Sequence, residues 1–281
     1  MPELPEVETV RAILKKRIVG KTIKDIIVQY GKIIKNQSPE EFAANLRGAR
    51  LTDISRHGKY LIFIFDKAIL VSHLRMEGKY LLSAANPYSK HEHVVFVFTD
   101  GSELRYHDTR KFGTMHLFMT TDLAAVLASK PLAKVGLEPF DEHLTPEYLS
   151  QWVTKSNRPV KSFLLDQTII GGLGNIYVDE VLFLSRIHPA ARVADLDKTS
   201  LEKLIENTRV VLTKAIAYGG TTVKSFLATD EVSGRFQNYL LVHTRTECPS
   251  CHHPVSKIRI AGRGTYYCEY CQKLPEDAGQ P

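Results

Sequence analysis

The residue types at the start of the chain could carry out nucleophilic chemistry. The sequence opens Met-Pro-Glu-Leu-Pro-Glu-Val-Glu, and because an initiator methionine before a small residue is usually removed, we expect a mature chain that begins with the secondary amine of Pro2. A free terminal amine has a reference pKa of about 8, which leaves a nucleophilic fraction at neutral pH. Its attack on a sugar aldehyde carbon gives an electron-withdrawing iminium. These eight residues are equally typical of an acidic helix cap, so both interpretations stay open here.

Four clustered cysteines form a second group with recognisable chemistry. Their spacing is Cys248-x2-Cys251-x16-Cys268-x2-Cys271. Two thiolate pairs on either side of a β-rich segment predict one tetrahedral zinc site, and clustering argues against dispersed disulfides. Four protein ligands leave no open position for chemistry, so we expect one structural Zn²⁺ ion. His252 and His253 adjoin the second cysteine, but the site does not need them.

The element that must hold the amine is a helix. Pro5 fits its first position, and Gly20 should end it. The positive end of this helix disfavours an ammonium, whereas Glu3 and Glu6 favour one. Apolar residues follow at helical spacing, namely Val7, Val10 and Leu14.

The first half of the chain is otherwise rich in strand patterns. A strand at 22–30 is followed by a helix that opens with the capping box Ser38-Pro39-Glu40-Glu41 and closes near Gly48. Short β-rich segments separated by turn residues, with a tight hairpin at Asp100-Gly101, then predict a β-sandwich. These segments are 51–56, 59–65, 68–73, 79–83, 94–99, 102–107 and 114–119.

Beyond residue 120 the pattern changes to helices. Thr121 can cap a helix over 122–129, and the stretch 131–145 has the composition of a linker. Four further helices are expected. One begins at 145–147, one spans 160–166, one begins at Asn175, and one spans 199–218 and ends at Gly219-Gly220.

Composition limits the class of protein. A chain of 281 residues that is 43% hydrophobic and 24% charged can bury a sizeable core in two domains plus a small module. No apolar run approaches the ~20 residues of a membrane span, and the acidic start does not resemble a signal peptide. We therefore expect a cytoplasmic protein without membrane association. A net charge of +6 suits a polyanionic partner, although many proteins without one are equally basic.

Separate motifs along the chain resemble the bacterial formamidopyrimidine-DNA glycosylases, the base-excision enzymes for oxidised purines. The resemblance begins with MPELPEVETV at residues 1–10 and extends to about residue 272. Further matches occur in the family's order, at His57-Gly58-Lys59-Tyr60, Ser72-His73-Leu74-Arg75-Met76-Glu77-Gly78, Asp108-Thr109-Arg110-Lys111-Phe112-Gly113, Gly172-Leu173-Gly174-Asn175-Ile176-Tyr177 and the cysteines.

The resemblance implies an α+β fold with an N-terminal β-sandwich domain and a C-terminal helical helix-two-turn-helix domain that carries a β-hairpin zinc finger. The expected boundaries are a catalytic domain at 1–130, a linker at 131–145, the helical domain at 146–235, the zinc finger at 236–272 and a tail at 273–281.

The resemblance also assigns catalytic roles. Pro2 would attack the sugar, Glu3 would be the acid for base release and ring opening, and Glu6 would be a supporting carboxylate. Lys59 would contact a phosphate and donate protons, and Arg263 would grip a phosphate and act in late elimination. Without the resemblance, Lys59 at a strand edge is more typical of a residue that discourages aggregation.

Further residues are implied as DNA contacts. Met76, Arg110 and Phe112 would fill the gap left by an extruded base. His73, in the same strand-to-turn segment as Met76, is also implied as a DNA contact. The residues alone equally allow a core methionine and a solvated basic turn. His91 is implied as a phosphate contact. His91 and His93 could share a strand face as metal ligands, but the sequence offers no third ligand.

Other contacts are implied around the helix-two-turn-helix. Asn175 follows a glycine turn at a helix N-terminus, a generic phosphate cradle. Lys155, with Arg158 and Lys161, forms a basic approach, although such runs are usually solvated. The lesion-recognition residues would be Glu77, Thr222, Lys224, Ser225 and Phe226. The chain departs from the family in having Lys224-Ser225-Phe226 for Arg-Thr-Tyr, and His243-Thr244 for Tyr-Gly.

The expected function is that of a bifunctional DNA glycosylase and abasic-site lyase that removes 8-oxoguanine and formamidopyrimidines. Its partner would be duplex DNA containing oxidised purines or abasic sites, and the protein would be a monomer. One alternative is the endonuclease VIII branch, which acts on oxidised pyrimidines and is disfavoured by Leu4, Met76, Arg110 and Phe112. The other is a non-catalytic zinc-dependent DNA-binding protein.

Overall fold

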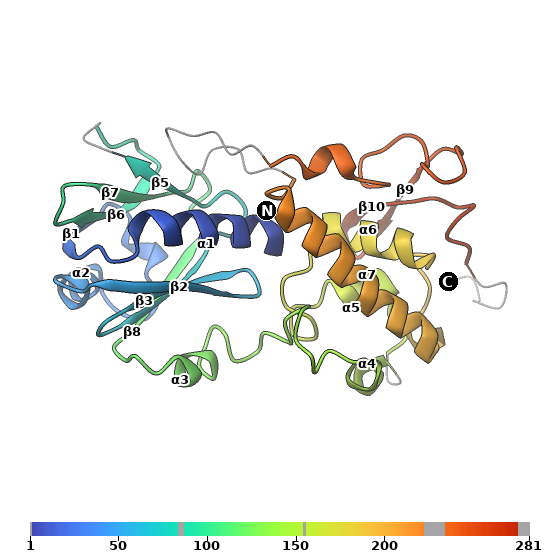
Figure 1. Cartoon of the computed structure of the whole chain (residues 1–281), viewed down its shortest axis with the longest axis horizontal. Coiled ribbons are helices and arrows are strands. Elements are labelled where there is room, and N and C mark those ends of the chain that lie inside the picture. Colours follow the sequence, from blue (N-terminus) through green and yellow to red (C-terminus); the bar gives the residue numbers. More distant parts are fainter. Residues whose placement is uncertain (1, 84–86, 154–155, 222–233, 275–281) are drawn as a thin grey trace. The chain divides into compact units, whose positions relative to one another are not determined.

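The chain folds into two compact units. The computed structural model describes residues 2–83, 87–153, 156–221 and 234–274 (Figure 1). Unit 1 comprises residues 1–134 and 219–234, and unit 2 comprises residues 135–218 and 235–281. Within the described residues, no helix is both long and apolar enough to cross a membrane.

Unit 1 begins with helix α1 (Leu4–Ile18), which packs one face into the core. Glu3 is the N-cap, and its backbone N–H donates to Glu6 Oε2 at 2.9 Å. The helix ends before Gly20, whose φ of 90° is a conformation that glycine adopts without strain. Pro5 occupies the second helical position rather than the predicted first, because Leu4 already has helical geometry. The predicted apolar face is buried, with Val7, Val10 and Leu14 at most 1% exposed.

Two four-stranded antiparallel sheets form the predicted sandwich. One sheet has the order β1-β6-β7-β5 and the other has the order β2-β3-β4-β8. Alternate residues of both sheets meet α1 and α2 in one hydrophobic core, which explains the period-two pattern of the sequence. The strands are β1 (Ile23–Val28), β2 (Leu51–His57), β3 (Tyr60–Phe65), β4 (Ile69–His73), β5 (Lys79–Ser83), β6 (Glu92–Phe98), β7 (Glu103–His107) and β8 (Thr114–Phe118).

Short helices lie between β1 and β2 and after β8. The predicted capping box is present at α2 (Pro39–Leu46), where the Ser38 hydroxyl accepts from Glu41 N–H and the Ser38 N–H donates to Glu41. Helix α3 (Leu123–Leu127) lies where a helix was predicted, but its cap is Asp122, which accepts from Ala125 N–H, and not Thr121. The 3-10 turn η1 (Gly31–Ile33) was not predicted.

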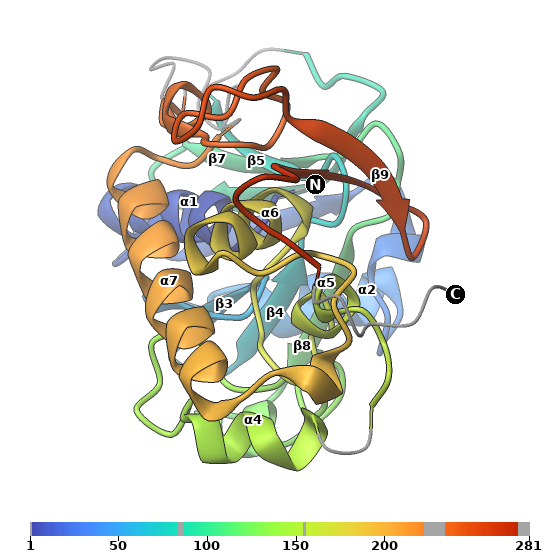
Figure 2. The same cartoon turned by 90° about the vertical axis from the view of Figure 1, so that its right-hand side faces the viewer.

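Unit 2 is helical and carries a β-hairpin. Its helices are α4 (Pro146–Val153), α5 (Val160–Leu164), α6 (Asn175–Ser185) and α7 (Lys198–Ala217), with 3-10 turns η2 (Val193–Asp195) and η3 (Phe236–Tyr239). Helices α6 and α7 pack side by side (Figure 2). The hairpin pairs β9 (Ser256–Ile260) with β10 (Arg263–Tyr267). The predicted stop after α7 is present, since Gly219 and Gly220 have φ values of 73° and 78°.

The stretch between α3 and α4 makes specific contacts. Gly136 N–H donates to Gln167 O at 2.8 Å, and a β-carbon on Gly136 would overlap the Ile169 carbonyl. Leu144 is buried. Residues from Val135 onward therefore pack as part of unit 2.

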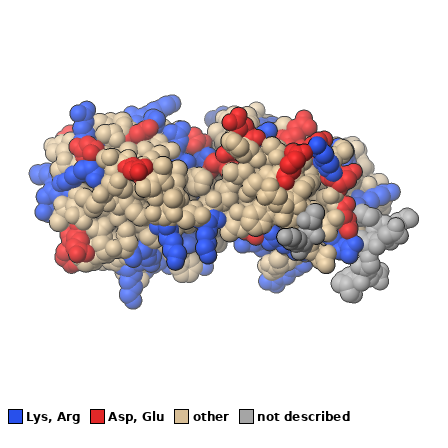
Figure 3. All heavy atoms as spheres, turned by 90° about the horizontal axis from the view of Figure 1, so that it is seen from below, with Lys and Arg blue, Asp and Glu red and all other residues tan. Residues whose placement is uncertain are grey.

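On the side shown in Figure 3, Lys and Arg side chains gather at several places, with wide uncharged stretches between them. The positive side chains on this side are thus divided into local groups rather than gathered in one continuous patch.

Candidate active site and DNA-binding residues

The two carboxylates next to Pro2 are buried at the start of α1. Glu3 and Glu6 are each 3% exposed. Glu6 is held from two sides, because Oε2 accepts from Glu3 N–H while Oε1 accepts from Thr221 N–H at 2.9 Å. A side chain at Gly220, where φ is 78°, would overlap the Glu6 carboxylate, so this approach needs glycine. The helix start and residues 220–221 thus form one rigid support directly after Pro2.

Lys59 lies in the two-residue turn between β2 and β3. Gly58 has a φ of 56°, which suits the first position of a tight hairpin turn. Arg56 donates to Gly58 O at 2.8 Å and to Glu8 of α1 at 3.2 Å. One guanidinium therefore links the helix that follows Pro2 to the turn that carries Lys59. Lys59 itself is only 6% exposed.

Glu8 and Arg11 strengthen the same link. Arg11 pairs with Glu8 and also donates to Ile54 O of β2 at 3.2 Å. Burial alone would raise the pKa of Glu8, but the Arg11 and Arg56 guanidinium groups outweigh it and lower this pKa. Sequence reasoning assigned Glu8 no role, because its partner Arg56 lies 48 positions away.

His73 is buried at the end of β4, beside the Lys59 turn. Its ring packs edge-on against Tyr60 at 4.5 Å, and Nδ1 accepts from Arg75 N–H at 2.9 Å. Burial, together with the positive charges of Arg75 and Lys59, lowers the pKa of His73 to about 3. The imidazole is therefore neutral at physiological pH and can offer a phosphate a hydrogen bond but no charge.

The two loops proposed to enter the duplex meet on Tyr106. A β-carbon on Gly78 or on Gly113 would overlap the Tyr106 hydroxyl, so both loops press their backbones against this one group. Asp108, which is fully buried, accepts from the N–H groups of Arg110 and Gly113. The loops 74–78 and 108–113 are consequently fixed side by side.

These loops expose the side chains that were predicted to enter the duplex. Met76 is 40% exposed and Phe112 52% exposed, and neither belongs to the core. The Arg110 guanidinium lies 4.7 Å from the Phe112 ring centroid. Arg75 and Lys111, which directly precede Met76 and Phe112, have φ values of 54° and 60°. Such left-handed residues cost about 1–2 kcal/mol each, so their occurrence in both loops fits a functional constraint. Glu77 is also exposed.

His91 and His93 do not share a ligand position. His93 Nε2 bonds to Asp108 O at 2.7 Å, whereas the His91 ring packs edge-on against His107 at 5.6 Å. Among the described residues, the cysteine cluster is the only group of three or more possible ligands. The structure thus offers no metal site at 91–93, and His91 remains half-buried beside His107.

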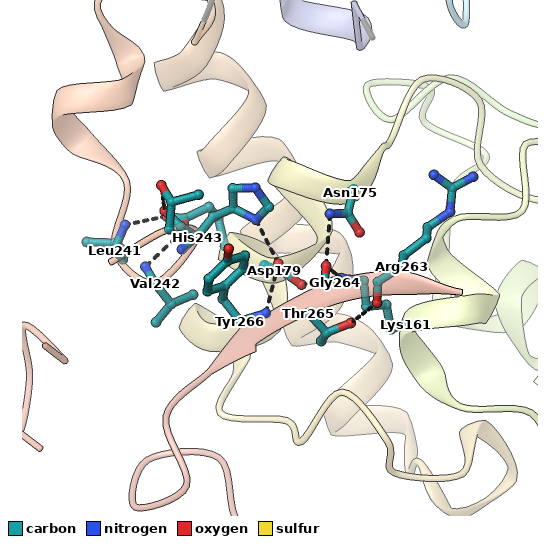
Figure 4. Close-up of polar contacts among 12 residues, drawn as sticks. Lys161, Asn175, Asp179, Leu241, Val242, His243, Arg263, Gly264, Thr265 and Tyr266 are labelled. Carbon is teal, nitrogen blue, oxygen red and sulfur yellow. Dashed lines mark hydrogen bonds and ion pairs between the residues drawn. The ribbon is translucent and has the colours of Figure 1, made fainter. Parts of the chain in front are cut away.

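In unit 2, Asn175 contacts the hairpin that carries Arg263. Asn175 is the first residue of α6, and its Nδ2 donates to Gly264 O at 3.0 Å (Figure 4). A side-chain amide has two N–H groups, so this bond leaves another for a phosphate. Arg263 is exposed at the start of β10, and its guanidinium extends on the side where Asn175 lies (Figure 4).

The four cysteines are arranged as a zinc site. Their sulfur atoms all lie within 4.8 Å of one another, with Cys248 to Cys271 at 3.7 Å and Cys251 to Cys268 at 3.4 Å. A tetrahedral ion with Zn–S bonds of about 2.3 Å separates its sulfurs by about 3.8 Å, so zinc fits this set. Cys248 and Cys268 pack with Phe183 of α6 and with Val242, which anchors the finger to the helices.

Five predicted site residues lie outside the described residues. They are Lys155, Thr222, Lys224, Ser225 and Phe226. Their roles therefore stay predictions.

Comparisons with known proteins agree with this arrangement. The N-terminal domain model of formamidopyrimidine-DNA glycosylase matches residues 1–115, and the H2TH domain model of the same enzyme matches residues 135–227. A zinc-finger model found in FPG and IleRS matches residues 247–274. The chain belongs to the formamidopyrimidine-DNA glycosylase family.

Relatives of this family match over nearly their full length. A formamidopyrimidine-DNA glycosylase of Bacillus cereus is 46% identical over 97% of this chain and 99% of its own length. The Lactococcus lactis Fpg in complex with abasic-site DNA has a TM-score of 0.88 at 41% identity, covering 96% of this chain and 99% of its own. The same Lactococcus enzyme in complex with N7-benzyl-Fapy-dG DNA has a TM-score of 0.88 at 41% identity, covering 97% of this chain and 100% of its own. The α+β fold and the zinc-finger prediction are confirmed.

Proposed function

We propose that this member of the family is a bifunctional DNA glycosylase and abasic-site lyase for oxidised purines such as 8-oxoguanine and formamidopyrimidines. The observation that carries the proposal is the rigid, buried pair Glu3 and Glu6 directly after Pro2, joined through Glu8 and Arg56 to the Lys59 turn. Relatives of nearly equal length carry the formamidopyrimidine glycosylase name, which favours the purine branch over the pyrimidine branch.

The proposed reaction begins at the amine of Pro2, once Met1 has been removed. Its lone pair forms a bond to C1′ of the damaged nucleotide, and the bond from C1′ to the base breaks with its electrons leaving on the base. Glu3, in its protonated form, gives its proton to the departing base. The resulting carboxylate then takes the N–H proton of Pro2 and passes it to O4′ as the C1′–O4′ bond breaks, which opens the ring and leaves an iminium at C1′. Glu6, fixed by Thr221, supports the geometry of this step.

Strand cleavage follows from the iminium. As an electron sink it acidifies the C2′ proton, so that β-elimination expels the 3′ phosphate and δ-elimination the 5′ phosphate. Lys59 would donate protons in these steps, and Arg263 would bind the phosphate that leaves late. The zinc ion supports the fold of the hairpin and takes no part in bond making, because all four ligand positions are filled by cysteines.

Substrate DNA would be bound as a bent duplex with the lesion extruded. Met76, Arg110 and Phe112 would occupy the gap, at an unstacking cost of about a few kcal/mol that is lowest for a damaged pair. His73, His91, Asn175 and Lys155 would contact the backbone, while Glu77, Thr222, Lys224, Ser225 and Phe226 would contact the damaged base. We propose that the protein acts as a monomer in the cytoplasm.

Covalent trapping tests this function. The mature protein is incubated with an 8-oxoguanine duplex and borohydride, which reduces an iminium to a stable amine link. We expect a covalent complex whose attachment site maps to Pro2 by mass spectrometry, and no complex from a chain with a stable N-terminal tag. Lys16→Ala, on the exposed face of α1, is the control that should trap normally. Attachment at a lysine, or efficient trapping by the tagged chain, would refute the role of Pro2.

A further inference from the structure

A fully buried carboxylate lies at the centre of unit 2 and has no part in the function proposed so far. Asp179 of α6 is 1% exposed and Lys161 of α5 is completely buried. Asp179 Oδ1 pairs with Lys161 Nζ at 2.6 Å. Its Oδ2 meets His243 Nδ1 at 2.7 Å and accepts from Tyr266 N–H at 3.1 Å (Figure 4). Three separate segments of the chain therefore converge on one side chain.

The same cluster holds the free edge of the zinc hairpin. One edge of β10 pairs with β9, which leaves backbone groups of the other edge to be satisfied elsewhere. Gly264 O accepts from Asn175 Nδ2 at 3.0 Å and from Lys161 Nζ at 3.2 Å. Tyr266 N–H, two residues along the same edge, donates to Asp179. Because Asn175 and Asp179 are four residues apart on α6, they share a helix face and grip adjacent points of the strand.

This arrangement has a geometric consequence for Arg263. A hairpin held only at Gly264 could pivot about that bond, and the exposed residue before Gly264 would move with it. The second contact at Tyr266, together with the Lys161 bridge, fixes the direction of β10 relative to α6. The position of Arg263 next to Asn175 is thus set by a carboxylate that lies inside the protein.

We propose that Asp179 is a positioning residue that aligns Arg263 with Asn175 for the DNA backbone. The inference rests on the proposed function, since it requires that Arg263 binds a phosphate. Asp179 touches no substrate and acts through the hairpin. Within the cluster, Lys161 neutralises the buried charge, and His243 ties in the segment before the zinc finger.

The decisive measurement is the salt dependence of binding to a duplex with a tetrahydrofuran abasic-site analogue. Each phosphate contact contributes about 0.9 to the slope of log K against log[salt]. Arg263→Ala should weaken binding roughly tenfold and lower the slope by about one. Asp179→Asn should produce the same two changes although Arg263 is still present, with one zinc ion per chain retained. The double variant should bind no more weakly than Arg263→Ala alone.

Matched variants separate this role from general destabilisation. Asp195→Asn makes the same chemical change in the exposed pair with Arg192 and should leave binding and slope unaltered. If Asp179→Asn does not fold, the combined variant Lys161→Met with Asp179→Leu replaces it, because removing both charges of a buried pair is usually tolerated. Its affinity and salt slope are then expected to change, and its zinc content to be retained, as described for Asp179→Asn.

Two results would overturn the inference while leaving the proposed function intact. One is a full wild-type salt slope in a folded, zinc-loaded Asp179 variant. The other is an additive loss of affinity in the double variant, since independent sites add. Failure of the wild-type protein to bind or cleave abasic-site DNA would instead contradict the proposed function itself.

Discussion

Replacing Gly113 with alanine should displace the loop that carries Arg110 and Phe112. A β-carbon at this position would overlap the Tyr106 hydroxyl and lie 2.7 Å from the ring carbon Cζ. Tyr106 is completely buried and its ring packs on Tyr80 at 5.3 Å, so it cannot move aside freely. Overpacking of this kind costs about 1–3 kcal/mol. We expect a loss of that size in the free energy of unfolding, and weaker binding of abasic-site DNA.

The clash with the hydroxyl can be relieved by a second substitution. Tyr106→Phe removes the overlapping oxygen at the cost of its 3.4 Å hydrogen bond to Asp108, worth about 0.5–1.5 kcal/mol. In the Gly113→Ala background the same change should restore part of the lost stability. The two substitutions should therefore couple by roughly 1 kcal/mol or more. Urea unfolding followed by circular dichroism measures this coupling.

Gly78→Ala provides the matched control. Its β-carbon would overlap both the Tyr106 hydroxyl and the Leu74 carbonyl, and the carbonyl is backbone that Tyr106→Phe leaves in place. Tyr106→Phe should rescue Gly78→Ala less than it rescues Gly113→Ala. Additive effects of Tyr106→Phe and Gly113→Ala, or equal rescue of both glycine variants, would show that the loops do not meet on this hydroxyl as described.

Four further predictions concern other parts of the molecule. Cys251→Ser should release zinc and greatly weaken DNA binding, while the circular dichroism signal of the sandwich persists. The effect stays local because the free energy of zinc binding is folding energy of the finger alone. Metal analysis that finds no zinc in the native protein would contradict this prediction. The unmodified protein should excise 8-oxoguanine opposite C faster than opposite A, and Arg110→Ala should reduce this preference. The reason is that a guanidinium can donate to the two acceptors of cytosine but meets a donor on adenine. Equal single-turnover rates of the unmodified protein opposite C and opposite A would disprove the assignment. The pKa of His73 is about 3 in the folded protein and about 6.5 in the unfolded chain. The free energy of unfolding should therefore fall as the pH drops from 6.5 towards 3, by about 2 kcal/mol at pH 5. His73→Gln should remove this pH dependence in urea titrations at several pH values. Arg56→Met should lower single-turnover cleavage at saturating DNA more than it lowers affinity, because it releases the Lys59 turn from α1; an unchanged rate would argue against that link.

Local patterns predicted most of the fold. Alternating hydrophobicity located the strands of the sandwich, and the Ser38 capping box and the Gly219-Gly220 stop marked helix ends correctly, because each depends on neighbouring residues. The cap of α3 was placed one residue early, since Thr121 and Asp122 are both good caps and sequence alone does not rank them. The cysteine spacing was sufficient for the zinc ligands, because four thiolates in two close pairs leave few other arrangements.

Contacts between distant residues could not be predicted in this way. Arg56 and Glu8 are 48 positions apart, and His243 and Asp179 are 64 apart. Neither pair produces a periodic pattern in the sequence, because a contact between polar side chains of different elements depends on which elements the fold brings together. Tyr106 has the pattern of an ordinary strand residue, and only the structure shows two glycine loops closing on its hydroxyl.

A common physical requirement connects these missed residues. An exposed side chain that enters DNA or holds a phosphate must keep its position without help from the core, since burial would hide it from the substrate. In this chain the position is supplied by buried polar groups beneath the exposed ones: Tyr106 and Asp108 under the Arg110–Phe112 loop, and Asp179 under Arg263. Such groups are costly when left unpaired, so each holds its loop in one geometry. Substitutions at these positions should therefore weaken DNA binding even though none of these side chains would touch DNA.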